Sequence, residues 1–146
     1  MRFWDASAVV PLLIAQPMSE RARALLAEDP EVVIWWGTAV ECASAFARLR
    51  REEGLDEPSE QASNARVDAY RQAWYELLPG DAVRAQALRV LRLHPLRAAD
   101  GLQLAAALEW SGTPVAGTLV TFDERLGAAA AREGLTVMGL TGPPSS

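Results

Sequence analysis

Four acidic residues of this chain adjoin apolar sequence, where a carboxylate is costly unless something compensates its charge. The first stands inside the opening run MRFWDASAVVPLL, and the others lie in VECASAF, LRAADGLQLAAAL and TFDERL. They are Asp5, Glu41, Asp100 and Asp123. If the fold gathers them, their oxygens form a ligand set for a hard cation such as Mg²⁺ or Mn²⁺. Such ions in an acidic site suit phosphoryl transfer.

Each acid also has a simpler explanation at the start of a helix. Asp5 would cap the helix that follows it. The T-x-x-E spacing of a capping box occurs at 38–41 and again at 121–124. Asp100 and Asp123 would each be favoured by the positive end of a helix. Taken one at a time, these capping roles are the better explanation.

The elements that would position these acids alternate between short apolar strands and helices. Apolar and β-branched runs predict strands at 1–5, 31–36, 115–121 and 135–140. Helical periodicity predicts helices at 6–14, 19–28, 38–53, 98–110 and 124–133. The middle of the chain, 59–93, reads as helical throughout, cut in two at Pro79-Gly80-Asp81, where Asp81 would cap the second piece.

Strands that alternate with helices pair in parallel through helical crossovers, so their carboxyl ends meet at one edge of one sheet. The sequence therefore predicts an α/β fold that brings the four acids together. Four capping carboxylates at one edge would raise each other's pKa and destabilise the fold. Because a divalent cation removes that conflict, we interpret the four acids as a metal site.

The rest of the composition narrows the classes of protein. The 146 residues, half of them apolar, predict one domain over 1–141 and a flexible tail over 142–146. No apolar run approaches the roughly 20 residues of a membrane span, and without a signal peptide a cytoplasmic protein is predicted. The net charge of −5 argues against a general nucleic-acid binder. It does not exclude a nuclease, because metal-binding acids count in that charge.

Missing residue types exclude further chemistry. The chain has no lysine, which excludes a P-loop and Schiff-base chemistry. His94 is the single histidine and Cys42 the single cysteine, so zinc sites built from several such side chains are excluded. His94 precedes a proline at a predicted helix end, which favours a structural role, and Cys42 lies on an apolar helix stripe that predicts a core position.

The four segments together resemble a known family. F-W-D-A-S-A, V-E-C-A-S-A, L-R-A-A-D-G-L-Q-L-A-A-A-L and T-F-D-E-R-L occur in the order and spacing of PIN-domain proteins, over Arg2 to about Leu140. The sequence is most similar to the VapC toxins of toxin–antitoxin pairs. The resemblance implies a three-layer α/β/α sandwich around a mainly parallel sheet. It also implies Mg²⁺- or Mn²⁺-dependent endoribonuclease activity that leaves a 5′-phosphate and a 3′-hydroxyl, with a cognate antitoxin and a homodimer as assemblies.

By position in the family pattern, Asp5 and Asp100 would be the central metal ligands. Glu41 and Asp123 would complete the site, the latter directly, through water or at a second ion. Two small hydroxyl residues, Ser7 and Thr121, match positions beside the acids, where they would support the ligands. The sequence departs from the family at 101–103, where Gly-Leu-Gln stands in place of residues that often include Ala and His.

Basic and aromatic residues are further candidates. Arg97 precedes Asp100 by one helical turn and is the candidate for contact with an RNA phosphate. Arginines 48, 50 and 51 are interpreted as favourable charges at a helix end. Tryptophans 4, 35 and 36 are predicted to be core residues, whereas 74 and 110 could pack at a dimer or antitoxin interface.

Two other functions stay open from the sequence. One is a PIN-type nuclease that processes RNA and has no toxin role. The other is a PIN-fold binding module without catalysis, against which the intact set of four acids speaks.

Overall fold

The five strands of this protein form one parallel sheet with helices on both faces. The computed structural model describes residues 1–140, and the predicted tail 142–146 lies outside the described residues. The described elements are, in chain order, β1 (Arg2–Trp4), α1 (Ala6–Leu13), α2 (Ser19–Glu28), β2 (Val32–Trp35), α3 (Thr38–Glu53), α4 (Glu57–Ala73), β3 (Tyr75–Leu77), α5 (Asp81–Leu93), α6 (Ala98–Ser111), β4 (Thr118–Val120), α7 (Glu124–Arg132) and β5 (Thr136–Met138).

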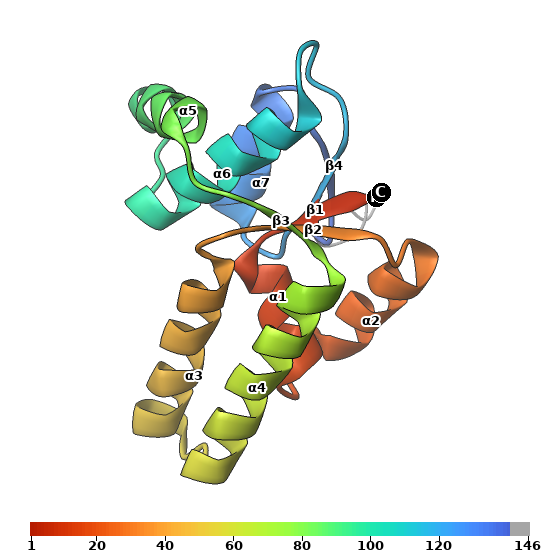
Figure 1. Cartoon of the computed structure of the whole chain (residues 1–146), viewed down its shortest axis with the longest axis vertical. Helices are drawn as coiled ribbons and strands as arrows, with labels where there is room; N and C mark the ends of the chain where they lie inside the picture. Colours follow the sequence, from red (N-terminus) through yellow and green to blue (C-terminus); the bar gives the residue numbers. More distant parts are fainter. Residues whose placement is uncertain (141–146) are drawn as a thin grey trace, which may run out of the picture.

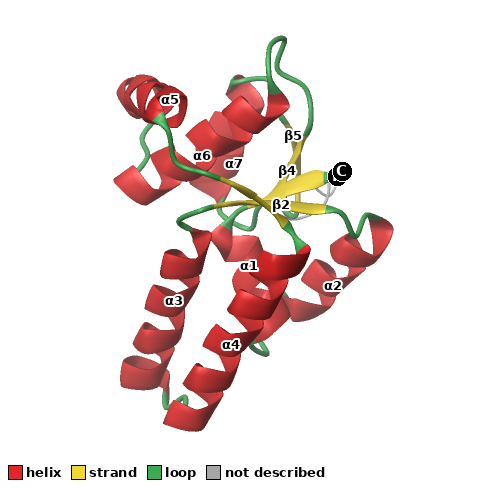
Figure 2. Ribbon diagram, in the orientation of Figure 1, coloured by secondary structure: helices red, strands yellow, loops and turns green. Residues whose placement is uncertain are grey.

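The sheet separates two layers of helices (Figures 1 and 2). Helices α1 to α4 cover one face, and α5 to α7 cover the other. Successive strand residues point to opposite faces. Phe3 and Leu119 therefore pack into the core under α5 to α7, whereas Trp4 and Val120 pack into the core under α1 to α4. The predicted α/β/α sandwich is confirmed.

The strand order is β3-β2-β1-β4-β5, with every neighbouring pair parallel. The chain moves from β1 through β2 to the β3 edge, and then returns past β1 to form β4 and β5. The order thus reverses at the middle of the sheet, between β1 and β4. In open α/β sheets, a crevice forms beside the carboxyl ends of the strands at such a reversal.

The predicted helical continuity of 59–93 is wrong at one point, because β3 interrupts it. Tyr75 of β3 lies opposite Val33 of β2, and Leu77 lies opposite Trp35. Three residues on an edge strand are too few to show an alternating pattern, and pairing with β2 decides their conformation. The predicted cap at Asp81 is also wrong, since Gly80 occupies the N-cap position of α5 without a side-chain hydrogen bond.

One prediction about the tryptophans is wrong, and the interface suggested for residues 74 and 110 stays a prediction. Trp36 is not a core residue: it lies just beyond β2 and is 49% exposed. Trp74 is partly buried and stacks on Tyr70, with ring centroids 4.4 Å apart. Trp110 is partly buried against Phe3 at 6.1 Å. Both of these rings are thus engaged within the chain.

The unusual Gly101 has a packing reason. It faces α5, and a Cβ at this position would lie 2.7 Å from Cδ2 of Leu91. Such a distance is too short for non-bonded carbons. The missing side chain therefore lets α5 approach the first turn of α6, which carries Asp100. This contact accounts for a glycine inside a helix despite its low helix propensity.

None of the helices in residues 1–140 is both long and apolar enough to span a membrane.

Candidate active site

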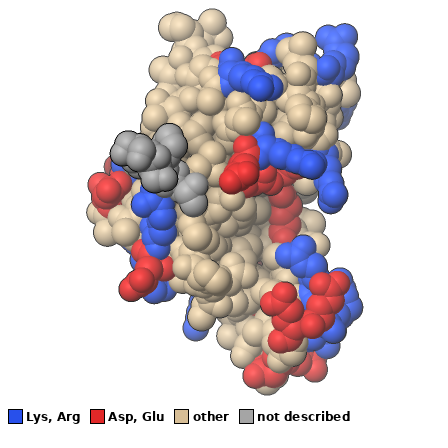
Figure 3. Space-filling model, turned by 180° about the vertical axis from the view of Figure 1, so that it is seen from behind, with Lys and Arg blue, Asp and Glu red and all other residues tan. Residues whose placement is uncertain are grey.

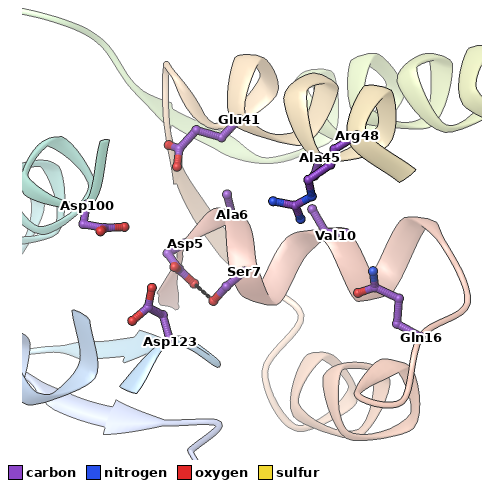
Figure 4. A pocket seen from close by; sticks show the side chains of 10 residues that line it. All are labelled: Asp5, Ala6, Ser7, Val10, Gln16, Glu41, Ala45, Arg48, Asp100 and Asp123. Atoms are coloured by element: carbon purple, nitrogen blue, oxygen red, sulfur yellow. Dashed lines mark hydrogen bonds between the residues drawn. The ribbon is translucent and has the colours of Figure 1, made fainter. Parts of the chain in front are cut away.

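The four acids from the sequence analysis line one cavity of about 430 Å³, which we call the carboxylate cavity (Figure 4). Asp5 follows β1 directly, and Asp123 lies shortly after β4. Glu41 and Asp100 come from the first turns of α3 and α6. Within residues 1–140, no three His, Cys, Asp or Glu side chains stand as a ready-made ligand group for one ion. The fold therefore gathers the acids around one space without closing them into a cage.

Asp5 caps a helix and also lines the cavity, so its capping role does not exclude the metal-ligand role predicted for it. Its Oδ1 accepts hydrogen bonds from the Ala8 N–H at 3.3 Å and the Ser7 hydroxyl at 2.8 Å, so Asp5 caps α1. Its Oδ2 accepts no hydrogen bond from the described residues. Asp5 is only 4% exposed, yet it lines the carboxylate cavity. One oxygen thus serves the helix, and the other remains available as a ligand.

Asp123 divides its oxygens in the same way. Its Oδ1 accepts from the Leu126 N–H at 3.1 Å and caps α7. The capping box that the spacing of 121–124 allows does not form, because Thr121 Oγ1 accepts instead from the Asp123 N–H at 3.0 Å. Asp123 is therefore fixed through its backbone as well as its side chain.

The capping box that the spacing of 38–41 allows is also absent. Helix α3 has Gly37 at its N-cap and no side-chain capping bond. Glu41 Oε2 instead accepts a hydrogen bond of 2.7 Å from Nε2 of Gln103 on α6. In the sequence, Gln103 stands out only as part of a departure from the family pattern. Its spacing of three residues from Asp100, which places both on one helix face, was the available signal.

Ser7 and Thr121 link the ends of β1 and β4 beside Asp5. The two hydroxyl oxygens lie 3.2 Å apart, and the Phe122 N–H donates to Ser7 Oγ at 2.9 Å. Since Ser7 also donates to Asp5, this small network sets the orientation of the Asp5 carboxylate between the two central strands.

Comparison with known families supports the same interpretation of the chain. The model of the PIN domain matches residues 2–132. The chain belongs to the PIN-domain family.

Solved structures similar to this PIN domain include a toxin and a toxin–antitoxin complex. FitAcB from Neisseria gonorrhoeae has a TM-score of 0.66 at 22% identity, covering 95% of this chain and 97% of that chain. VapC20 from Mycobacterium tuberculosis, a Sarcin-Ricin loop cleaving toxin, has a TM-score of 0.68 at 18% identity, with coverages of 88% and 95%. A toxin–antitoxin complex from Klebsiella pneumoniae has a TM-score of 0.63 at 13% identity, covering 88% of this chain and 91% of that chain. The TM-scores show a shared fold, and at these low identities the likeness extends to the fold alone. No curated protein matches the chain in sequence.

Burial sets the electrostatics of this PIN domain. It raises the pKa of Asp5 to about 7, against the opposing effect of the Ser7 hydrogen bond. Burial likewise raises the pKa of Glu41 to about 7, and the negative charge of Asp100 adds to the effect. The pKa of Asp100 is raised by burial first and then by Asp123. A cation in the cavity would favour the charged forms that burial disfavours.

Arginines surround this acidic centre. An adjoining cavity of about 480 Å³ is lined by Arg48, Arg97 and Arg125 together with three of the four acids. Arg48 also lines the carboxylate cavity and reaches over α1 toward it, which goes beyond the helix-end role predicted for it (Figure 4). Arg50 instead pairs with Glu60 of α4 at 3.1 Å. On one face of the molecule, acidic side chains gather near the centre with arginine side chains beside them (Figure 3).

Sequence reasoning missed Arg125, although it stands in the T-F-D-E-R-L segment that was noticed. His94 does not line either cavity. It is 8% exposed, and its Nε2 lies 3.0 Å from Glu133 Oε2, so it ties the loop before α6 to the end of α7.

The metal-free protein should lose stability as the pH rises from about 4 to about 8. The pKa values of Asp5 and Glu41 are about 7 in the folded protein, above their ordinary 3.8 and 4.5. The folded state therefore retains protons that the unfolded chain releases, and this contribution disappears as the pH passes through 7. Asp5→Asn keeps a capping oxygen and removes the charge. In the presence of a chelator at pH 8, we expect it to melt on the order of 5 °C above the wild type, measured by calorimetry.

The matched control is Asp56→Asn. Asp56 is the exposed N-cap residue of α4, and its hydrogen bonds with Ser59 lower the pKa of its carboxyl group. That variant should melt at or below the wild-type temperature at pH 8. A lower melting temperature for Asp5→Asn at pH 8 would contradict charge repulsion as the dominant effect of burying Asp5.

Proposed function

We propose that this PIN domain is a Mg²⁺- or Mn²⁺-dependent endoribonuclease and the toxin of a toxin–antitoxin pair. The observation that carries the proposal is the carboxylate cavity: four acids from four separate segments line one space at the carboxyl ends of β1 and β4. If these acids were only helix caps, they would need neither to line one cavity nor to have raised pKa values.

The donor set fits a hard divalent cation. The four candidate ligands are carboxylates, and neither a histidine nor a cysteine lines the cavity among the described residues. Asp5 and Asp100 would hold the ion, and Glu41 and Asp123 would complete its surroundings. When bound, the ion polarises the scissile phosphate and lowers the pKa of a water. The remaining work falls to the chain: Ser7 and Thr121 orient Asp5, and the cap on α7 orients Asp123.

The arginines support a phosphodiester as the substrate. Arg48, Arg97 and Arg125 come from three different segments and are exposed beside the acids. Guanidinium groups bind phosphate oxygens through paired hydrogen bonds. Arginines on the rim would bind phosphates of the RNA backbone, while the acids at the centre would hold the cation beside the scissile phosphate. This division of charge reconciles a net charge of −5 with a polyanionic substrate.

The toxin role, with a cognate antitoxin, a homodimer and a cytoplasmic RNA target, rests on the VapC-like sequence pattern. The structural neighbours support it, because VapC20 is a toxin and the Klebsiella pneumoniae structure is a toxin–antitoxin complex. A neighbouring short gene for a DNA-binding antitoxin would favour this role over RNA processing.

Asp5→Asn and Asp100→Asn should each abolish RNA cleavage, reducing the rate at least about 100-fold, because each removes a ligand charge from the cavity. The measurement is sequencing of cellular RNA ends after induced expression, with cleavage of the identified RNA by purified protein and Mn²⁺. Asp56→Asn, on the exposed start of α4, should cleave at the wild-type rate. Cleavage by Asp100→Asn equal to the wild type would contradict the assignment.

Arg97→Ala and Arg125→Ala should weaken RNA binding and lower the slope of log K against log salt by about 1 each. Binding is measured by fluorescence anisotropy with single-stranded RNA, using Asp100→Asn as the background so that the RNA stays intact. Arg84→Ala is the control, since Arg84 is exposed on α5 and lies 3.7 Å from Asp81. If the slope of log K against log salt is the same in all three variants, the rim arginines do not contact phosphate.

A further inference from the structure

Gln103 lies in the interior directly behind the carboxylate cavity. It is 1% exposed and stands one helical turn after Asp100 on α6. Its Nε2 donates to Glu41 Oε2 at 2.7 Å and to Thr38 Oγ1 at 2.9 Å. Both acceptors belong to the first turn of α3. One amide therefore connects the two helices that supply Glu41 and Asp100.

Glu41 has no other hydrogen-bond donor among residues 1–140, and α3 begins without a side-chain cap. A glutamate side chain has several rotatable bonds, and ordering it without a partner is unfavourable. The Gln103 bond is short and reaches a carboxylate, which makes it one of the stronger kinds of hydrogen bond. Figure 4 shows the Glu41 carboxylate directed from α3 toward Asp100 and Asp5. The amide thus fixes the direction in which Glu41 enters the cavity.

The opposite end of the same amide is unsatisfied. Gln103 Oε1 is buried and has no hydrogen-bond partner in the described part of the chain. An orphaned buried acceptor costs about 1–3 kcal/mol. One turn further along the same face of α6 stand the buried apolar residues Ala106 and Ala107, so an apolar side chain would suit this position better for packing alone. The presence of an amide is explained by what its nitrogen does for Glu41.

We propose that Gln103 is a positioning residue that presets the Glu41 carboxylate for cation binding opposite Asp100. This inference rests on the proposed metal-dependent function. Gln103 acts through Glu41 and makes no contact with the cation or the RNA. Its removal should therefore weaken cation binding while leaving the fold intact.

The test is Gln103→Met, which keeps nearly the same shape and removes the donor. Titration calorimetry with Mn²⁺ at pH 7.5 on the full chain should show an affinity about 10-fold below the wild type, the lower end of what loss of a ligand-supporting residue costs. The metal-free melting temperature should change by only a few degrees, because losing the orphaned oxygen offsets losing the bond to Glu41. In a Glu41→Gln background, Gln103→Met should cause no further loss of affinity.

Thr38→Val is the matched control, since it removes the other acceptor and leaves the bond to Glu41. It should change Mn²⁺ affinity less than about 3-fold, well short of the loss expected for the ligand-supporting residue. If Gln103→Met fails to fold, Gln103→Asn carries the same test, because its shorter side chain withdraws the donor from Glu41.

The outcomes separate the two proposals. Wild-type protein that does not bind Mn²⁺ overturns the metal-dependent function and this inference with it. Wild-type binding together with an unchanged affinity in Gln103→Met overturns the positioning role alone. A lower melting temperature with unchanged affinity would identify Gln103 as a purely structural link between α3 and α6.

Discussion

The structure is organised around the burial of negative charge at the carboxyl ends of β1 and β4. Removing a carboxylate from water disfavours its charged form, and nearby acids increase the effect. Asp5 is almost completely buried at this point, with Glu41, Asp100 and Asp123 around the same cavity. A fold selected for stability alone would avoid this arrangement. The acids are understandable together if a cation joins them when the protein works.

Helix capping and ligand binding are compatible in this site because a carboxylate has two oxygens. Asp5 and Asp123 each give Oδ1 to the N-terminus of the helix that follows. This use fixes the carboxylate without consuming its second oxygen. Glu41 reaches the same result by a different route, through Gln103 on a neighbouring helix. Each of these three acids is thus held by one oxygen, in a site that is ordered before any cation binds.

Much of this arrangement could be predicted from local sequence. The α/β class, the parallel sheet and the convergence of the four acids follow from the alternation of apolar strands with helices. Features set by contacts distant in sequence could not be predicted. Strand β3 exists because Tyr75–Leu77 pairs with β2, and Gln103 matters because α6 lies against the start of α3. The exposure of Trp36 follows from where β2 ends, which a run of apolar letters does not show.

The arrangement of charge also explains how an acidic protein would meet RNA. The acids occupy the centre of the site, and arginines from α3, α7 and the loop before α6 stand at its rim. A phosphate backbone would therefore meet positive charge first and the cation-bearing centre next.

Anomalous diffraction from crystals of the full chain with Mn²⁺ near pH 7.5 tests the central claim most directly. The account predicts a Mn²⁺ peak in the carboxylate cavity, within direct ligand distance of Asp5 Oδ2 and an Asp100 oxygen. Glu41 and Asp123 should lie beside that ion, directly or through one water. A Mn²⁺-saturated crystal with no peak in this cavity would contradict the account.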